Sequence, residues 1–194
     1  MSTIVLSVPK LVEAIKNNAV DKLREELVKA GKVVIQVYKF PRFKLKVRST
    51  GKNLVELNEL VFNKLEYSLL KAVIEASKNN RLPAFKDVAD LASDYKVAAK
   101  YITVLAEMGY VVFPDPVKAS KLIEASRALS ESRYQRRISK ALDLPIVLNI
   151  EALEKNAKQI PCVYKNNKIV CIYLSHGEER DQEKTIVKLF NEYI

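Results

Sequence analysis

The stretch DVADLASDYKVAAKYITVLAEMGYV, residues 87–111, predicts the centre of the fold. Two runs with apolar residues at helical spacing flank the polar joint SDYK, residues 93–96, and the second run ends at Gly109. This pattern predicts two short helices, at 85–92 and 97–108, joined by a tight turn. It is typical both of a helix-turn-helix that lies in a DNA groove and of two helices that only pack on each other, and both interpretations remain open here.

The segments on either side complete a known order of elements. A helix is expected at 58–80 and a short strand at 110–113, followed by PDP at 114–116. Residues 60–113 therefore resemble a winged helix-turn-helix of the broad kind found in archaeal and bacterial transcription regulators. The matching segments are VADLA as second helix and AAKYITVLAEMGYVVF as third helix running into the first wing strand. Because PDP stands where a returning wing strand is expected, the resemblance implies a vestigial wing or one supplied elsewhere.

The resemblance also implies which side chains would approach DNA. Recognition helices usually meet base edges with their N-terminal residues. The nucleic-acid candidates of this segment are Ser93, Tyr95, Lys96, Lys100 and Thr103. Two lysines are few for a helix that reads a groove, and a winged helix with so little charge is often a protein-docking module, so this alternative is kept.

The net charge of the chain points to a polyanionic partner. Lys and Arg number 33 against 23 Asp and Glu, which gives a net charge of +10 and a pI near 9.5. Such an excess concentrates nucleic acid near a protein, although lysines that only maintain solubility would give the same sum. The excess lies mainly in residues 1–59, with 12 cations against 6 acids, and in 114–142, with 7 against 3.

The N-terminal excess coincides with a predicted hairpin. After a helix at 8–30 that ends at Gly31, a β-rich run at 33–40, a turn and an alternating run at 43–48 predict two paired strands. No acid occurs between residues 27 and 55, so the outward cations would track a phosphate backbone. These candidates are Lys39, Arg42, Lys44, Lys46 and Arg48. The alternative is a solvated edge strand, because exposed lysines discourage sheet-to-sheet aggregation.

A second basic cluster follows the helix-turn-helix. Residues 116–142 predict one long helix or two, with a break near 130–132. In the second half, four cations fall on one face, opposite Tyr134 and Ile138. These candidates are Arg133, Arg136, Arg137 and Lys140. Arginine suits bidentate phosphate contact, so we expect nucleic acid or an acidic partner to bind here.

The two cysteines are expected to face each other across a hairpin. With Asn166-Asn167 as a two-residue turn, Cys162 lies directly opposite Cys171 in a non-hydrogen-bonded pair, close to disulfide geometry. Two buried thiols packed side by side are the alternative, because intracellular disulfides are rare outside hyperthermophiles. A zinc site is not expected, since only His176 would join them and structural zinc takes four ligands.

Motifs of catalysis and cofactor binding are not recognised in the sequence. The four glycines are scattered, so no phosphate-cradling loop is predicted, and His176 beside Ser175 has no orienting acid marked. We expect a protein that is not an enzyme and needs no cofactor or metal; a nuclease is the third hypothesis.

Without a basic leader or a run of about 18 apolar residues, we expect a cytoplasmic protein with no membrane partner. The Lys-, Glu-, Ile- and Val-rich composition is faintly typical of thermophiles.

These patterns together predict an α+β fold. We expect an N-terminal helix and basic β-hairpin at 1–57, a winged-helix-like module at 58–115, a basic connecting helix at 116–142 and a C-terminal β-α-β-β-α unit at 143–194. The expected function is binding of duplex DNA, as a transcription regulator or a chromosome or replication accessory factor. The alternative is a protein-interaction subunit of a nucleic-acid-processing or defence complex. Residues 143–194 would form a homodimer contact or bind a protein partner. The sequence does not decide between DNA and RNA as the ligand, and it leaves the target and the oligomeric state open.

Overall fold

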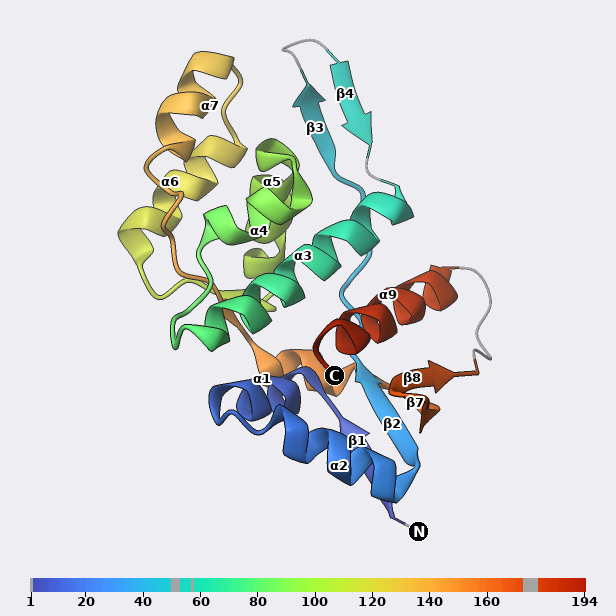
Figure 1. Cartoon of the computed structure of the whole chain (residues 1–194). Helices are drawn as coiled ribbons and strands as arrows, with labels where there is room; N and C mark the ends of the chain where they lie inside the picture. Colours follow the sequence, from blue (N-terminus) through green and yellow to red (C-terminus); the bar gives the residue numbers. More distant parts are fainter. Residues whose placement is uncertain (1, 50–52, 57, 173–177) are drawn as a thin grey trace. The chain divides into compact units, whose positions relative to one another are not determined.

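The computed structural model of the chain has a mixed α+β fold, as the sequence predicts (Figure 1). It describes residues 2–49, 53–56, 58–172 and 178–194, and for 46–49, 53–56, 59 and 178–180 it describes the backbone alone. Contacts divide the chain into two compact units. Unit 1 comprises Met1–Lys39, Ile74–Arg81 and Glu154–Ile194, and unit 2 comprises Phe40–Val73 and Leu82–Leu153.

Unit 1 is built on a four-stranded sheet of order β1-β2-β7-β8. Its strands are β1 (Thr3–Leu6), β2 (Lys32–Val37), β7 (Lys158–Lys165) and β8 (Lys168–Cys171). The first two are parallel, and the other two neighbouring pairs are antiparallel. A parallel pair needs a crossover, which α1 (Val8–Lys16) and α2 (Val20–Ala30) supply. Helix α9 (Glu178–Tyr193) closes the unit.

The helix expected at 8–30 is two helices. Ser7 caps α1 by accepting the Lys10 amide, and the helix ends where Asn18 takes a left-handed backbone with φ of 50°. Asparagine tolerates this conformation better than most residues, so the chain turns here and α2 starts afresh. The expected end at Gly31 is found, with φ of 73°.

The hairpin expected between 33–40 and 43–48 is corrected by the strand pairing. Both edges of β2 are occupied, one by β1 and the other by β7. Its Val- and Ile-rich sequence suits this central position, and Val33, Ile35 and Val37 are buried. Strand β3 (Lys46–Ser49) pairs instead with β4 (Asn53–Glu56), the next strand along the chain.

Unit 2 contains the two short helices that were expected on either side of residues 93–96. Helix α3 (Glu59–Lys78), whose last residues belong to unit 1, precedes α4 (Phe85–Ala92) and α5 (Tyr95–Glu107). The turn between α4 and α5 is tight because Ser93 is left-handed, with φ of 60°, and Asp94 caps α5 by accepting the Val97 amide at 3.0 Å. Gly109, with φ of 87°, follows α5 and leads the chain into a short strand.

Short backbone pairings connect distant parts of unit 2. Strand β5 (Val111–Val112) pairs with β6 (Val147–Leu148), and Ala84 forms an isolated antiparallel bridge with Pro145. Between these two strands lie the helices α6 and α7, and helix α8 follows β6. Their bounds are α6 (Pro116–Ser126), α7 (Glu131–Ile138) and α8 (Ile150–Lys155).

The expected β-α-β-β-α unit at 143–194 is also corrected. Its first strand, β6, pairs with β5, whereas β7 and β8 extend the sheet that β1 and β2 begin. The physical reason is backbone satisfaction, because each of these short strands finds its hydrogen-bond partner more than 30 residues away or in the adjoining hairpin. The compact units therefore do not follow the expected boundaries at 57, 115 and 142.

Candidate nucleic-acid interface

Helix α5, the expected recognition helix, is covered along most of its surface. Seven of its residues are buried, and they lie on more than one side of the helix: Val97, Ala98, Ala99, Tyr101, Ile102, Thr103 and Leu105. An amphipathic surface helix would instead bury a single stripe. Helices α6 and α7 contact the side of α5 that carries Lys96 and Lys100, which was expected to face DNA.

Lys96 is held by α7. Its ammonium group donates to the carboxylate of Glu131 and lies 5.2 Å from the ring centroid of Tyr134. A cation between a carboxylate and an aromatic face has its charge compensated on both sides. Lys96 is therefore committed to packing α7 against α5.

Lys100 and Thr103 continue the same covered side. The Lys100 ammonium donates to the backbone carbonyl of Ser126, at the end of α6, over 3.1 Å. Thr103 is 4% exposed, and its hydroxyl has no hydrogen-bond partner among the described residues. The expectation that Thr103 meets a groove is corrected by its burial, which follows from the packing of α6.

Ser93 and Tyr95 lie at the open end of the helix-turn-helix. Ser93 is exposed in the turn, while Tyr95 is half-buried and packs its ring edge-on to Phe85, with centroids 6.2 Å apart. The Tyr95 hydroxyl donates to the Asp90 carboxylate, which raises the pKa of Tyr95 to about 12. Of the five candidates in this segment, Ser93 alone is exposed and makes no side-chain contact with a described residue.

Arg42 is half-buried in unit 2. Its guanidinium donates to the Asn63 side chain at 2.7 Å, lies 3.5 Å from the Glu66 carboxylate and sits over the Phe62 ring at 5.5 Å. Glu66 is 4% exposed, so the arginine compensates a buried charge. Arg42 is therefore engaged inside unit 2, and its contact with phosphate stays a prediction.

The other candidates of the expected hairpin do not all lie on a single hairpin. Lys39 belongs to unit 1 and follows β2, whereas Lys44 is exposed in unit 2. Lys46 and Arg48 lie in β3, and their side chains fall outside what the structure describes. Ser175 and His176 lie outside the residues that the structure describes.

The cations of α7 and its following turn form the exposed basic group of unit 2. Arg133, Arg136 and Lys140 are exposed, and none of them forms an ion pair with a described residue. They project from the side opposite Tyr134 and Ile138, which are buried. Arg137 differs, because its Nε lies 3.6 Å from the Glu124 carboxylate of α6.

Three acids near this group, Glu124, Glu131 and Asp143, are compensated by other cations. Glu124 lies 3.7 Å from the Lys121 ammonium as well as near Arg137. Glu131 accepts from Lys96, and Asp143 accepts from the Lys118 ammonium at 2.7 Å. These bonds hold the pKa values of Glu131 and Asp143 below their ordinary range. The positive charges of Arg133, Arg136 and Lys140 are therefore left without a counter-charge. We call these three residues the α7 cation group.

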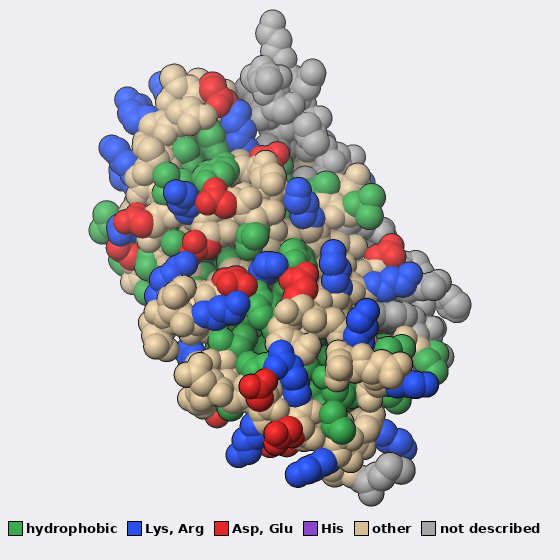
Figure 2. Space-filling model, in the orientation of Figure 1, with side chains coloured by type: hydrophobic (Ala, Val, Ile, Leu, Met, Phe, Trp, Pro, Cys, Tyr) green, Lys and Arg blue, Asp and Glu red, His purple; other side chains and the backbone are tan. Residues whose placement is uncertain are grey.

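Lys86 was not a sequence candidate, and its backbone is bonded to the segment that follows the α7 cation group. It is exposed at the start of α4, and its backbone amide donates to the Leu142 carbonyl at 2.9 Å, two residues beyond Lys140. Nothing in the sequence marks it, because a single lysine in a first helical turn is unremarkable. Figure 2 shows Lys and Arg side chains gathered at its upper left, where α6 and α7 lie.

The two cysteines lie in unit 1. The expected register is found: Asn166 and Asn167 form the turn with positive φ, and Cys162 pairs with Cys171. Their Cα atoms are 4.2 Å apart, and a disulfide joins the sulfurs. It ties β7 to β8 across the hairpin.

Within the described ranges, no group of three His, Cys, Asp or Glu side chains is arranged to hold a metal ion. No helix that the structure describes is both long and apolar enough to cross a bilayer. The chain was also compared with family models, curated proteins and solved structures, and none of them matches it.

Proposed function

We propose that the protein binds the phosphate backbone of duplex nucleic acid, most simply DNA, through the α7 cation group. The observation that carries this proposal is the charge of Arg133, Arg136 and Lys140, which are exposed and form no ion pair with a described residue, while Glu124, Glu131 and Asp143 pair with other cations. Arginine donates two parallel hydrogen bonds to a phosphate, and a helix face presents several such donors at once. Lys86 extends the same surface.

The proposed binding is largely independent of sequence. Phosphate contacts position a protein on a duplex, whereas base contacts give it specificity. The expected base readers Lys96 and Lys100 are engaged by α7 and α6, and Thr103 is buried. A chromosome or replication accessory factor fits such binding better than a regulator that selects one operator.

The scaffold of this surface is, we propose, a modified winged helix. The helices α3, α4 and α5 follow one another in the order of a winged helix. The backbone at residues 145–148 pairs with Ala84 through a bridge and with residues 111–112 through the β5–β6 pair. In this interpretation residues 147–148 supply the returning wing strand. The α6–α7 segment then takes the place of the wing loop, which in related modules often contacts a duplex.

A salt titration of duplex binding tests the proposal. The variant Arg133→Gln/Arg136→Gln/Lys140→Gln removes the α7 cation group, and fluorescence anisotropy measures its affinity for a labelled DNA duplex and for an RNA duplex. The slope of log K against log salt is negative, and each lost phosphate contact reduces its magnitude by about 0.9. The magnitude of the slope should therefore decrease by about 2 to 3 in this variant. Two unrelated duplex sequences should bind the wild type with similar affinity.

The matched control removes the same charge from unit 1. Lys16, Lys22 and Lys29 are exposed on α1 and α2 and form no ion pair with a described residue, so the triple Lys→Gln variant there should keep the wild-type slope. If both triple variants lose affinity equally, net charge alone drives binding and the assignment to α7 fails. The non-catalytic part of the proposal is tested in the same samples with Mg²⁺ or Mn²⁺, where shortened DNA would contradict it.

A further inference from the structure

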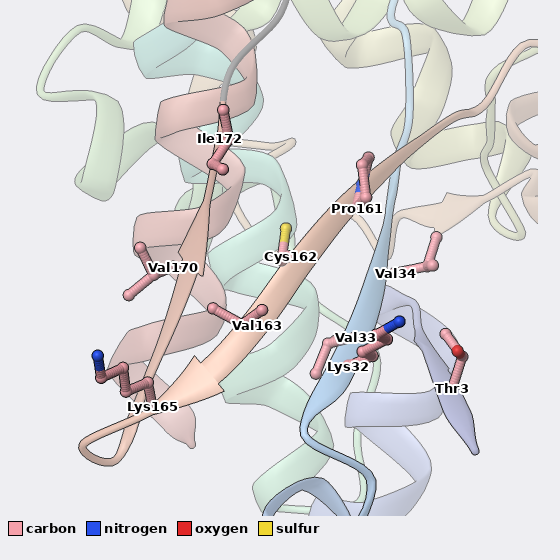
Figure 3. A pocket seen from close by; sticks show the side chains of 10 residues that line it. All are labelled: Thr3, Lys32, Val33, Val34, Pro161, Cys162, Val163, Lys165, Val170 and Ile172. Carbon is pink, nitrogen blue, oxygen red and sulfur yellow. The ribbon is translucent and has the colours of Figure 1, made fainter. Parts of the chain in front are cut away.

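One face of the unit 1 sheet is apolar and exposed. The strand register places Thr3, Lys32, Val163 and Val170 side by side across β1, β2, β7 and β8, and the next positions on that side are Val5, Val34 and Pro161. Among them, Val5, Val163 and Val170 expose 43%, 45% and 51% of their surface, and Ile172, which follows β8, exposes 77%. Figure 3 looks onto this face, which we call the open sheet face.

The opposite face of the same sheet is covered by the protein's own helices. Its residues Val33, Ile35, Ile160 and Ile169 are 3% exposed or less. Helix α9 lies behind the sheet in Figure 3. A sheet with apolar residues on both faces is normally covered on both, as in layered α/β and α+β folds. Among the described residues no second layer covers the open sheet face, and a hollow of about 730 Å³ extends over it.

The rim of the open sheet face is positively charged. Lys32, Lys165 and Lys168 occupy positions on this side of the strands, are exposed and form no ion pair with a described residue. No acidic residue occupies a position on this side of β1, β2, β7 or β8. The chemistry that complements the face is therefore apolar at its centre and acidic at its edges.

We propose that the open sheet face docks an acidic amphipathic helix of a partner protein. A helix about 10 Å wide spans two to three strands spaced about 4.8 Å apart, so its apolar side meets the valines while its carboxylates reach the lysines. A second copy of the chain fits less well, because pairing two such faces brings their lysines together. Single-stranded nucleic acid also fits less well, since its bases stack on aromatic rings and this face is aliphatic. The inference does not depend on nucleic-acid binding by unit 2.

Fluorescence anisotropy with two designed probes tests the inference on the full-length protein. The first is a labelled helical peptide of roughly 18 residues, about five turns, with Leu and Ala on one side and Glu on the other. The second has Lys in place of every Glu. The acidic peptide should bind in the micromolar range and the basic peptide at least about tenfold more weakly. In Lys32→Glu/Lys165→Glu/Lys168→Glu, this preference should reverse.

The apolar part of the contact is tested with shape-conserving substitutions. Val163→Thr/Val170→Thr retains the β-branched shape but adds hydroxyl groups, and should weaken the acidic peptide about tenfold or more. Val112→Thr is the matched control, because Val112 is a strand residue in unit 2 with 49% exposure, and it should leave binding unchanged. Circular dichroism and thermal melting verify that each variant folds.

Four outcomes would overturn the inference. They are equal binding of the two peptides, wild-type affinity in the double Thr variant, stronger binding to phosphatidylserine vesicles than to the acidic peptide, and a dimer in sedimentation that the double Thr variant loses. The third outcome would assign the face to an anionic membrane surface, and the fourth to a second copy of the chain.

Discussion

The ammonium group of Lys96 in α5 is bound by the carboxylate of Glu131 in α7, 35 residues further along the chain. This contact turns a lysine expected to read DNA into one that joins two helices of unit 2. It also pairs the acid at the start of α7 with a lysine of α5, and Arg133 and Arg136, which follow on α7, are exposed without an ion pair to a described residue. The ion pair thus engages a lysine of the expected interface on α5, and it pairs the acid that lies closest in sequence to the proposed interface on α7.

The first prediction concerns the pH dependence of this contact. The bond from Lys96 lowers the pKa of Glu131 below its ordinary 4.5, so the stabilisation is present above pH 4.5 and is lost as pH falls through the lowered value. Glu131→Gln should therefore melt below the wild type at pH 7, and the two melting temperatures should converge in acid. Glu13→Gln, at an exposed position of α1, should leave the neutral melt unchanged. A difference between Glu131→Gln and wild type that persists undiminished at pH 2 would contradict this.

The second prediction separates packing from recognition at Thr103. Its hydroxyl is buried without a hydrogen-bond partner among the described residues, so Thr103→Val removes an unsatisfied polar atom while retaining the shape. The free energy of unfolding should stay level or rise by about 1 kcal/mol, measured by urea denaturation. Duplex affinity should not change. A clear loss of DNA binding with unaltered stability would show that Thr103 reaches the nucleic acid.

The third prediction treats Arg42 as the partner of a buried acid. Arg42→Met leaves the Glu66 carboxylate without this counter-charge and should destabilise unit 2 by about 3 kcal/mol. Arg42→Met/Glu66→Met should cost clearly less than the sum of the two single changes, because the double variant buries no charge. Denaturant titrations of the four proteins give the coupling energy. Additive costs, or a normal stability with weakened duplex binding, would return Arg42 to the list of phosphate contacts.

The fourth prediction concerns the Cys162–Cys171 disulfide. Its closed loop is short, so reduction should lower the stability of unit 1 by about 2–3 kcal/mol by chain entropy. Thiol titration in denaturant should detect no free thiol before reduction and two after it. Because cytosolic disulfides are rare outside hyperthermophiles, an oxidised hairpin also bears on the compartment in which the protein works. Two free thiols in freshly isolated protein would end this part of the account.

Local signals in the sequence predict much of this fold. The helix expected at 85–92 is α4, and the Asn166-Asn167 turn sets the register that joins the cysteines. Capping residues, glycines and turn asparagines act within a few residues of themselves, so their consequences can be read directly.

The pairing of strands could not be predicted in the same way. Strand β1 has four residues, too few for a clear alternation, and the partner of β2 along its second edge lies more than 100 residues away. Sheet partners are chosen by burial and by the satisfaction of backbone groups across the whole unit, which local propensity does not report.

The same difference between local and distant interactions applies to the candidate site. Arg133, Arg136 and Lys140 were found from helical spacing, and their exposure agrees with it. Lys96 and Lys100 also had outward spacing, but their partners Glu131 and Ser126 lie 35 and 26 residues away. An amphipathic pattern identifies a polar side of a helix; it does not say whether another helix covers that side.

Backbone NMR of the labelled protein titrated with a short DNA duplex tests the central claim most directly. Amide shifts should concentrate in Glu131–Lys140 and around Lys86, and they should weaken as salt is added. Amides of α5 between Tyr95 and Glu107 should move little. Shifts centred on α5, with those of α7 unchanged, would show that the covered helix is the one that binds DNA and would contradict the account.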